Sequence, residues 1–217
     1  MPPRVVQVEL LDLLPPEHPA VRHNRRDLRL TNQVMGNHRW LARILRVRLR
    51  RGDRVLELGA GTGEFARRLL REGREVDGLD RCPAPGGWPR AARWHRADLR
   101  QFDGYGDYAA VCGNLIFHQF TASELRAIGG RIQAHARLLV ACEPARWRRS
   151  RWLFGVVAPV LGANYVSRHD GRVSIAAGFL DDELPELLGL DPAQWAWQRS
   201  TTLLGAYHLV AWHREAP

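Results

Sequence analysis

The sequence predicts a doubly wound α/β fold, in which helices cover both faces of a mostly parallel sheet. Two observations carry this prediction: short apolar runs ending in a polar residue or glycine recur along the chain, and helix-like segments or crossover loops separate them. A chain of 217 residues with 45% hydrophobic and 25% charged residues can bury one substantial core. We therefore expect a single globular domain with small additions.

The expected elements alternate along the chain from residue 54. Each strand candidate is a short apolar run, and each helix candidate carries apolar residues at helical spacing. The predicted strands span residues 55–59, 75–80, 92–99, 108–115, 137–144, 196–204 and 206–213, and the predicted helices lie near 64–73, 121–134 and 181–190. Asp181 is the expected N-cap of the last helix.

Two segments do not fit this alternation, and they define the expected organisation. Residues 1–51 hold a proline-bounded leader and two helix candidates that break near Gly36-Asn37, which predicts an N-terminal leader and helical cap. Residues 52–217 then form the main domain. Within it, residues 145–177 are too long for a simple connection and are predicted to be an inserted lid, although their SRHDGRVS stretch also fits a chain-reversing turn at Asp170-Gly171.

The net charge of +9 does not by itself indicate a polyanionic partner. All 32 basic residues are arginine and none is lysine, which is typical of a coding bias rather than of a selected binding face. The densest run, LARILRVRLRRGDR, fits a helix with its leucines inward and its arginines in water. Nucleic acid is therefore not the expected partner.

Cysteine usage and hydropathy bound the remaining classes. The three cysteines lack CxxC spacing, so neither a disulfide framework nor a metal site is expected. The N-terminus lacks the basic and apolar regions of a secretory signal, and the longest apolar run, 152–162, is too short to span a bilayer. We expect a cytoplasmic protein without a membrane partner, acting as a monomer or homodimer.

A glycine-rich turn follows the first predicted strand in VLELGAGTGEFA, residues 55–66. Ligands of doubly wound sheets bind at the carboxyl ends of the strands, and glycine lets them approach the backbone. Glu64 stands where the dinucleotide fingerprint GxGxxG has its third glycine. Glu57 and Glu64 would repel a pyrophosphate but suit a ligand with sulfonium and ammonium groups, so the turn predicts S-adenosylmethionine. A structural turn without a ligand is the alternative.

Acidic residues end the next two predicted strands. Asp80, followed by Arg81, comes 21 residues after Gly59, where a carboxylate can accept hydrogen bonds from both ribose hydroxyls of an adenosine. Asp98 ends the third strand, where it fits either a contact with adenine or a helix N-cap. Both acids extend the expected cofactor site along the edge of the sheet.

Together, VLELGAGTG, VDGLD, ADL and GNLIFHQF resemble the successive motifs of class I S-adenosylmethionine-dependent methyltransferases, over residues 50–145. The resemblance implies a three-layer Rossmann-like fold with a seven-stranded, mostly parallel sheet and an antiparallel last strand. It also implies which residues line the cofactor. They are Glu57, Gly59, Ala60, Gly61 and Gly63 in the turn, Asp80 and Arg81 at the ribose, Asp98 and Leu99 at the adenine, and Asn114 and Leu115 in the fourth-strand wall.

The class of methyl acceptor depends on the fourth-strand motif. The chain lacks the Pro-Pro-aromatic sequence of methylases that act on exocyclic amines, and no cysteine follows a proline as in methylases of the cytosine ring. GNLIFHQF followed by TASEL resembles small-molecule methyltransferases of quinone and secondary-metabolite biosynthesis. Residues 24–40 and 143–179 resemble small bacterial methyltransferases associated with polyketide synthases. The resemblance implies a small aromatic acceptor.

Two histidines are candidate bases for an acceptor that must lose a proton. His118 follows the fourth predicted strand, and packing against the cofactor is its alternative role. His169 stands beside Asp170, and a solvated turn is the alternative there. The expected acceptor contacts are Met35, His38, Trp152, Tyr165 and Arg168, although ordinary core packing also explains such aromatic residues.

The sequence therefore predicts an S-adenosylmethionine-dependent methyltransferase that O-methylates a phenolic or polyketide-derived hydroxyl. Three alternatives stay open. They are C-methylation of a quinone-type ring, an RNA-directed methyltransferase that uses the arginine-rich N-terminal helices, and a cofactor-binding protein without catalysis.

Overall fold

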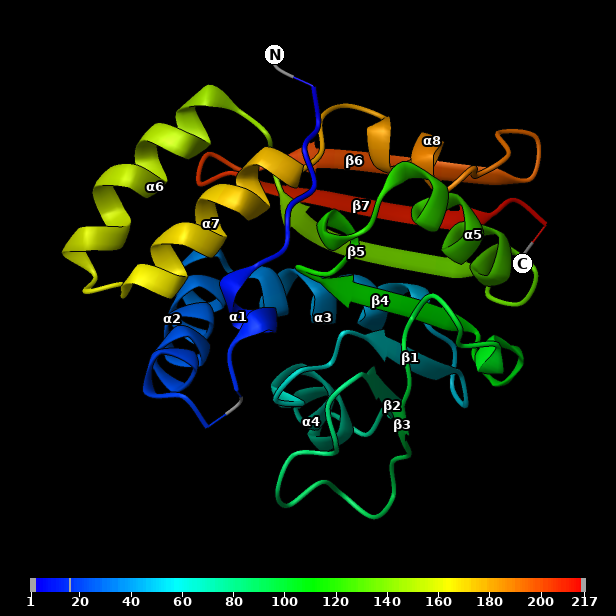
Figure 1. The fold of residues 1–217 in the computed structure, drawn as a ribbon. Coiled ribbons are helices and arrows are strands. Elements are labelled where there is room, and N and C mark those ends of the chain that lie inside the picture. The colour runs from blue at the N-terminus through cyan, green and yellow to red at the C-terminus, as the bar shows by residue number, and fades with distance from the viewer. Residues whose placement is uncertain (1–2, 16, 216–217) are drawn as a thin grey trace.

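A seven-stranded sheet runs through the molecule with strand order β3-β2-β1-β4-β5-β7-β6 (Figure 1). The computed structural model describes residues 3–15 and 17–215. All neighbouring strands are parallel except β7, which runs antiparallel to both β5 and β6. This confirms the predicted fold class. The strands are β1 (Arg54–Leu58), β2 (Glu75–Asp80), β3 (Trp94–Arg96), β4 (Ala110–Asn114), β5 (Leu138–Pro144), β6 (Trp195–Thr201) and β7 (Ala206–His213).

Helices cover both faces of the sheet because successive strand residues point to opposite sides. Val55 of β1 faces α3 (Asn37–Arg48) and α4 (Glu64–Arg71) in one core cluster. Leu56 of the same strand faces α5 (Ala122–Gln133) and α8 (Glu183–Leu187) in the other. All seven residues of β5 are buried, since β5 is covered on both faces.

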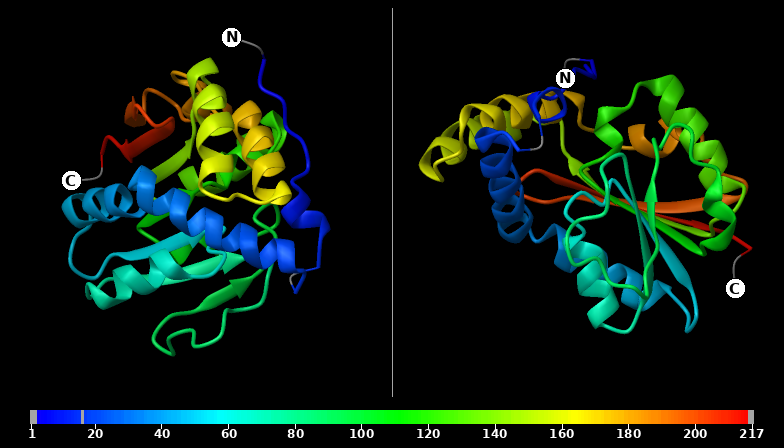
Figure 2. Two further views of the ribbon diagram at one scale, coloured as in Figure 1. Left: turned by 90° about the vertical axis from the view of Figure 1, so that its left-hand side faces the viewer. Right: turned by 60° about the horizontal axis from the view of Figure 1, so that its bottom comes forward.

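Four further helices lie at the edge where the parallel strands end (Figures 1 and 2). They are α1 (Leu10–Leu13), α2 (Pro19–Met35), α6 (Arg148–Val160) and α7 (Tyr165–Ala177). Residues 3–14, which include α1, form an extended segment that we call the N-terminal strap. It crosses α7 and the short 3₁₀ helix η2 (Phe117–Gln119), and a second 3₁₀ helix, η1 (Gly104–Asp107), precedes β4.

Local sequence signals account for several element ends. Gly36 adopts a left-handed conformation, φ 72°, between α2 and α3, where the break was predicted. Thr121 begins α5 with a capping box in which its side chain and that of Glu124 each bond the other residue's backbone N–H. The predicted cap at Asp181 is wrong: α8 begins after Asp182, whose side chain makes no capping bond, and Asp181 itself has φ 41°.

The predicted lid is a hairpin of two helices, α6 and α7. The alternative turn at Asp170-Gly171 does not form, because both residues lie inside α7, whose N-cap is Asn164. Gly171 is required there, since a Cβ at this position would lie 2.1 Å from Cζ of Phe154 on α6. The two helices therefore pack closely enough to form one unit.

The expected boundary near residue 51 does not separate two cores. Leu41 and Leu45 of α3 are fully buried and share a cluster with Val55 and Phe65 of the main domain. Helix α3 is thus one of the layers that cover the sheet, whereas α1 and α2 form the cap. Cys112 and Cys142 are buried on β4 and β5, as a small apolar side chain would be.

In the part of the chain that the structure describes, none of the helices has the length and hydropathy needed to cross a bilayer.

Candidate functional site

The turn between β1 and α4 is built on three left-handed glycines. Gly59, Gly61 and Gly63 have φ values of 62°, 54° and 69°, which L-residues with a Cβ rarely adopt. A Cβ at Gly59 would lie 2.7 Å from Cδ1 of Ile116, so glycine at this position also lets the Ile116 side chain, which follows β4, pack against the turn. At Gly61 the nearest atom to such a Cβ is 3.8 Å away, in the backbone of Gly59. Gly61 therefore leaves the turn open to a ligand, and Ala60 is anchored by its N–H to O of Leu79, 3.1 Å.

Glu57 lies beneath this turn rather than on its open side. Its carboxylate accepts the N–H of Ala66 at 3.0 Å, which caps the first turn of α4 because the N-cap residue, Gly63, has no side chain. Burial raises the pKa of Glu57 to about 8, and the negative charges of Asp80 and Glu64 add to this effect against the Ala66 hydrogen bond. At neutral pH Glu57 is mostly uncharged here, so the attraction for a cation that we expected from it falls to Glu64 and Asp80.

Asp80 stands at the end of β2 and connects that strand to the glycine turn. Its Oδ2 accepts the N–H of Gly61 at 2.8 Å, and its Oδ1 accepts the N–H of Cys82 at 2.8 Å. Each carboxylate oxygen has capacity for a further donor. The next residue, Arg81, reaches away from the turn and pairs with Asp12 of the strap, Nη2 to Oδ1 2.8 Å.

Asp98, which follows β3, is closely held by Arg100. The guanidinium donates from Nε to Oδ1 at 3.0 Å and from Nη2 to Oδ2 at 2.6 Å, and these hydrogen bonds keep the pKa of Asp98 below its usual range. No helix starts at Asp98, so it is not a helix N-cap, and its Oδ1 also accepts the backbone N–H of Arg100 at 2.9 Å. The side chain of Leu99 is buried in the core, so only its backbone is placed to meet a ligand.

The end of β4 carries a cluster of three asparagines. Asn114 donates to Oδ1 of Asn32 on α2 at 3.0 Å, and Asn37 of α3 donates to Oδ1 of Asn114 at 3.2 Å. Oδ1 of Asn37 is buried and has no hydrogen-bond partner among the described residues. Leu115 then adopts a left-handed conformation, φ 58°, a strain that costs about 1–2 kcal/mol in a non-glycine residue and concentrates at functional sites. Side chains of α2 and α3 therefore fix the position of Asn114 at the end of β4.

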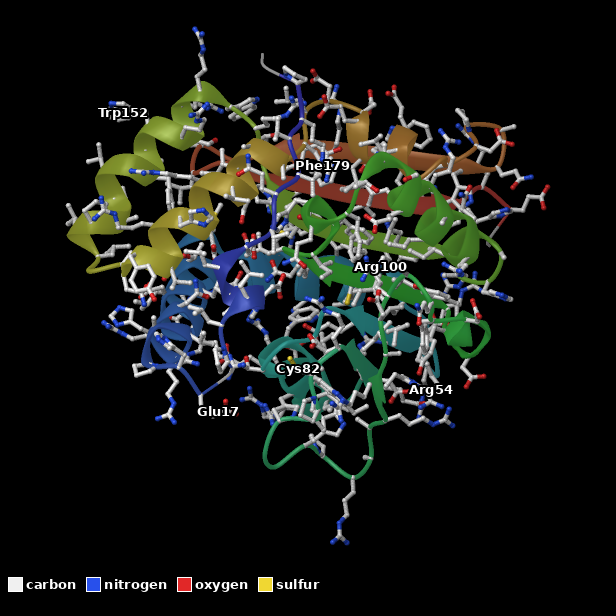
Figure 3. The ribbon with its side chains drawn as sticks, in the orientation of Figure 1. Glu17, Arg54, Cys82, Arg100, Trp152 and Phe179 are labelled. Atoms are coloured by element: carbon white, nitrogen blue, oxygen red, sulfur yellow. The ribbon has the colours of Figure 1, made fainter. Side chains whose placement is uncertain are left out.

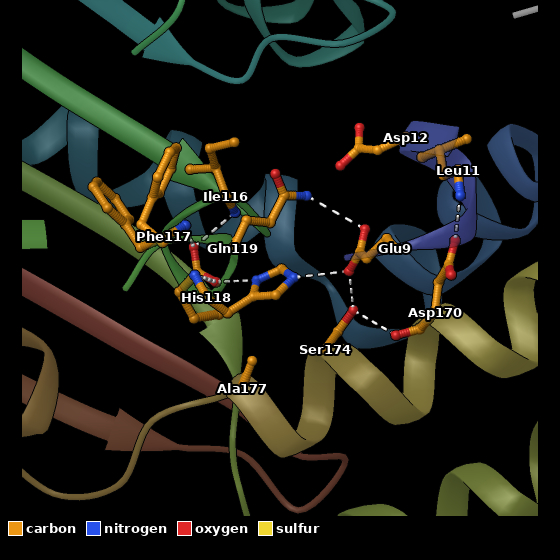
Figure 4. A network of polar contacts seen from close by, with 12 residues as sticks. Glu9, Leu11, Asp12, Ile116, Phe117, His118, Gln119, Asp170, Ser174 and Ala177 are labelled. Carbon is orange, nitrogen blue, oxygen red and sulfur yellow. Dashed lines mark hydrogen bonds and ion pairs between the residues drawn. The ribbon is translucent and has the colours of Figure 1, made fainter. Parts of the chain in front are cut away.

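His118 lies in η2 between two carboxylates (Figure 4). Its Nδ1 is 2.7 Å from Oε2 of Glu143 and its Nε2 is 3.2 Å from Oε1 of Glu9. Burial opposes the charged ring, but the hydrogen bonds and charges of Glu143 and Glu9 outweigh it and raise the pKa of His118 to about 9. Neither glutamate was among the expected site residues. An acidic residue inside the apolar strand RLLVACEP was a signal for Glu143, whereas nothing local marks Glu9.

His169 differs from His118 because one of its nitrogens is free. Its Nδ1 is 3.0 Å from Oδ1 of Asp170, and Nε2 has no partner among the described residues. The side chain is 44% exposed and lines a groove of about 470 Å³ between the strap and α7. Tyr165 and Arg168 line the same groove with Gln7 of the strap, so the structure brings two of the five expected acceptor contacts together with the candidate base His169.

The other expected acceptor contacts lie elsewhere. Met35 packs against the core cluster under α3, and the ring of His38 lies 5.3 Å from that of Phe65, where burial lowers the pKa of His38 to about 4. Trp152 is 70% exposed on α6, and Figure 3 shows it at the outer rim of the molecule. Among the described residues, the groove beside α7 is lined by two of the five expected acceptor contacts, and Met35, His38 and Trp152 do not line it.

Within residues 3–15 and 17–215, no three His, Cys, Asp or Glu side chains are grouped so that they could hold a metal ion.

Comparisons with known proteins define the fold of the chain. No protein-family description and no curated protein matches it. Among solved structures, the plantazolicin methyltransferase BpumL in complex with SAH has a TM-score of 0.69 at 11% identity over 91% of each chain. The plantazolicin methyltransferase BamL, in complex with a triazolic desmethylPZN analogue and SAH, has a TM-score of 0.68 at 11% identity over 89% of each chain.

A third structure concerns the conversion of a disulfide bond into a thioacetal group during echinomycin biosynthesis. It has a TM-score of 0.57 at 20% identity over 80% of each chain. At these identities the likeness establishes the fold: the chain has a seven-stranded Rossmann-like architecture similar to that of these methyltransferases.

Proposed function

We propose that this protein is an S-adenosylmethionine-dependent methyltransferase. The observation that carries the proposal is the turn of three left-handed glycines, open at Gly61 and hydrogen-bonded to the carboxylate of Asp80. It lies at the end of β1, where the strand order reverses and α/β sheets bind their ligands. Two neighbours of the same fold carry SAH, the demethylated form of this cofactor.

The residues present fit this cofactor. Gly59, Ala60, Gly61 and Gly63 would hold its methionine part, and Asp80, beside Arg81, has lone pairs left for the ribose hydroxyls. Asp98 and the backbone of Leu99 would contact the adenine. The carboxylate of Asp98 would then accept hydrogen bonds from both Arg100 and the adenine. The remaining proposed contacts are Glu57 beneath the turn, and Asn114 and Leu115 after β4. Oδ1 of Asn37, which is buried without a partner among the described residues, offers a further hydrogen-bond acceptor beside Asn114. When bound, the cofactor would supply an activated methyl group.

For the acceptor, we propose a small molecule with a phenolic hydroxyl, in secondary metabolism. The support is the groove beside α7, which offers the aromatic ring of Tyr165, the cation of Arg168 and the His169–Asp170 pair. Asp170 orients the imidazole, and Nε2 of His169 would take the phenolic proton. His118 is not proposed as the base, because both of its nitrogens already face carboxylates. A cytoplasmic location and the monomeric or dimeric state stay predictions.

Calorimetric titration with S-adenosylmethionine and SAH tests the cofactor. We expect Asp80→Ala to weaken binding by about 1.5–3 kcal/mol, the cost of a lost charge-assisted contact. Asp107→Ala is the matched control, because this aspartate is exposed and remote from the turn. Equal affinity of the two variants would remove Asp80 from the site, and no binding to the wild-type protein would end the proposal.

The acceptor is tested by turnover of labelled cofactor with phenols, resorcinols and quinones, read by product mass. If His169 is the base, His169→Ala lowers turnover about a hundredfold while cofactor affinity stays intact. His135→Ala, which changes an exposed histidine elsewhere, serves as the control. Full activity of His169→Ala would show that the acceptor needs no base at this position.

A further inference from the structure

Both ring nitrogens of His118 are committed to carboxylates that come from distant parts of the chain. Glu143 ends the buried β5, whereas Glu9 belongs to the N-terminal strap, 109 residues away from the histidine. A neutral imidazole donates through only one nitrogen, so simultaneous donation to both carboxylates requires the protonated ring. The cluster is 4% exposed or less at His118 and Glu143, and 9% at Glu9, so water does not replace these contacts.

One side of the cluster fixes the wall next to the glycine turn. Oε1 of Glu143 accepts the N–H groups of Ile116 at 2.9 Å and Phe117 at 2.8 Å, and Oε2 accepts that of His118 at 3.3 Å. These bonds hold the chain immediately after the strained Leu115. They also hold Ile116 at the position where its side chain meets Gly59. A change at Glu143 or His118 is therefore transmitted to the proposed cofactor site.

The other side of the cluster fixes the strap. Besides His118, Glu9 accepts hydrogen bonds from Ser174 of α7 and from Gln119, the latter at 3.3 Å (Figure 4). In the same segment, the guanidinium of Arg4 donates to the carbonyl of His118 at 2.9 Å and to that of Phe120 at 2.8 Å. The strap is thus attached to η2 along much of its length.

The strap also reaches the edge where the cofactor is proposed to bind. Asp170 of α7 accepts the N–H groups of Leu10 at 2.7 Å and Leu11 at 3.0 Å, which fixes the start of α1. Three residues after Glu9, Asp12 pairs with Arg81, the neighbour of Asp80. A molecule held by Gly61 and Asp80 would therefore lie next to α1, and its exchange with solvent depends on how firmly the strap is attached.

We propose that the Glu9–His118–Glu143 cluster latches the N-terminal strap to the cofactor wall, so that His118 is a positioning residue that slows cofactor release. The inference rests on the proposed function. The latch holds while His118 carries its proton and loosens when the proton leaves. The charged and titratable groups that face it are Glu143 from β5, Glu9, Arg4 and Asp12 from the strap, and Asp170 from α7.

Three variants separate a latch from a base. Glu9→Gln keeps the size and an acceptor oxygen but removes the charge on the strap side only, so the β4–α5 turn should stay intact. His118→Gln removes the cation, and Glu17→Gln is the matched control because Glu17 is exposed just beyond the strap. For each, we measure hydrogen exchange of the strap amides and the dissociation rate of SAH.

We expect Glu9→Gln and His118→Gln each to raise the rate of hydrogen exchange at the amides of Leu10 and Leu11 by about tenfold. Both variants should also raise the dissociation rate of SAH by about tenfold. Glu17→Gln should behave like the wild type in both measurements. In the wild type, the dissociation rate should rise between pH 8 and 10 as His118 deprotonates, and Glu9→Gln should flatten this rise.

Unchanged strap exchange in Glu9→Gln would overturn the latch. A loss of turnover in His118→Gln with unchanged dissociation would overturn it too, in favour of base catalysis. If the wild type binds no SAH, the proposed function fails, while the exchange measurement still tests the latch independently.

Discussion

Glu57 and Glu143 are both buried glutamates on neighbouring parts of one sheet, yet they differ in how many N–H groups they accept and in whether a cation faces them. Glu57 accepts one backbone N–H, from Ala66, and faces no cation, so burial raises its pKa to about 8. Glu143 accepts three backbone N–H groups and faces the charged ring of His118. Both carboxylates cap a turn from a neighbouring element. The comparison shows two ways of burying a glutamate: Glu143 is surrounded by donors and a cation, whereas Glu57 has one donor and its pKa rises.

Asp170 is an intermediate case on the strap side. It accepts two backbone N–H groups of α1 and contacts only the half-exposed His169. The three carboxylates therefore differ in their partners: Glu143 binds three backbone N–H groups and His118, Glu57 binds one N–H group, and Asp170 binds two N–H groups of the short helix α1. Removal of the side chain should have its largest effect at Glu143, which has the most partners, and its smallest at Asp170, whose backbone partners belong to a four-residue helix.

The largest effect is expected at Glu143. Glu143→Ala leaves a buried imidazolium with one carboxylate and strands three backbone donors, so unfolding free energy should fall by about 3–5 kcal/mol. Urea unfolding at pH 7 measures this loss. Glu75→Ala, at the exposed start of β2, should change the unfolding free energy by less than about 0.5 kcal/mol. Similar losses at both positions would mean that Glu143 and His118 do not form a buried charged pair.

Glu57→Gln should change how stability depends on pH. Because the folded-state pKa of Glu57, about 8, lies above the unfolded value of 4.5, its contribution is present below pH 4.5 and is lost as pH rises through 8. The wild type should therefore lose at most about 5 kcal/mol across this window, and Glu57→Gln should not. Denaturation midpoints from pH 5 to 9 give the comparison, with Glu64→Gln as control. An unchanged slope in Glu57→Gln would place the titration elsewhere.

His118 contributes a second, later loss to the same curve. Its folded-state pKa of about 9 exceeds the unfolded 6.5, so its contribution is present below pH 6.5 and is lost as pH rises through 9. Glu57→Gln should retain this alkaline decline, whereas His118→Gln should remove it.

The smallest effect is expected at Asp170. Asp170→Ala removes the acceptor of two N–H groups from the four-residue helix α1, which typically costs about 1 kcal/mol. Thermal unfolding measures this loss, and Asp103→Ala, whose exposed side chain makes no capping bond, is a suitable control. A loss as large as that of Glu143→Ala would show that the strap is a cooperative part of the core rather than its edge.

The fold was predictable because its signals are local. The apolar runs became strands within a few residues of their expected ends, since a strand covered on both faces must be apolar along its length. The break at Gly36 followed from the preferences of glycine, and α5 begins after Thr121, close to its expected start, with a capping box. The cap predicted at Asp181 failed because α8 begins one residue later, after Asp182, and the backbone at Asp181 is left-handed.

The candidate site divides in the same way. The glycine turn and Asp80 lie next to each other in the structure because parallel strands deliver their carboxyl ends to one edge. By contrast, Trp152 was expected in the acceptor pocket but points outward on α6, since an aromatic residue in a long insertion has no local signal of its direction.

The sequence by itself determined the positions of the strands, the glycine turn and the acid at the end of β2. The reason is that spacing along the chain sets which residues reach the edge of a parallel sheet. Only the tertiary structure decided that the pKa of Glu57 is raised and that both ring nitrogens of His118 face carboxylates. A residue's ionisation depends on burial and on partners such as Glu9, which lies 109 residues away from His118, and no local pattern encodes that contact.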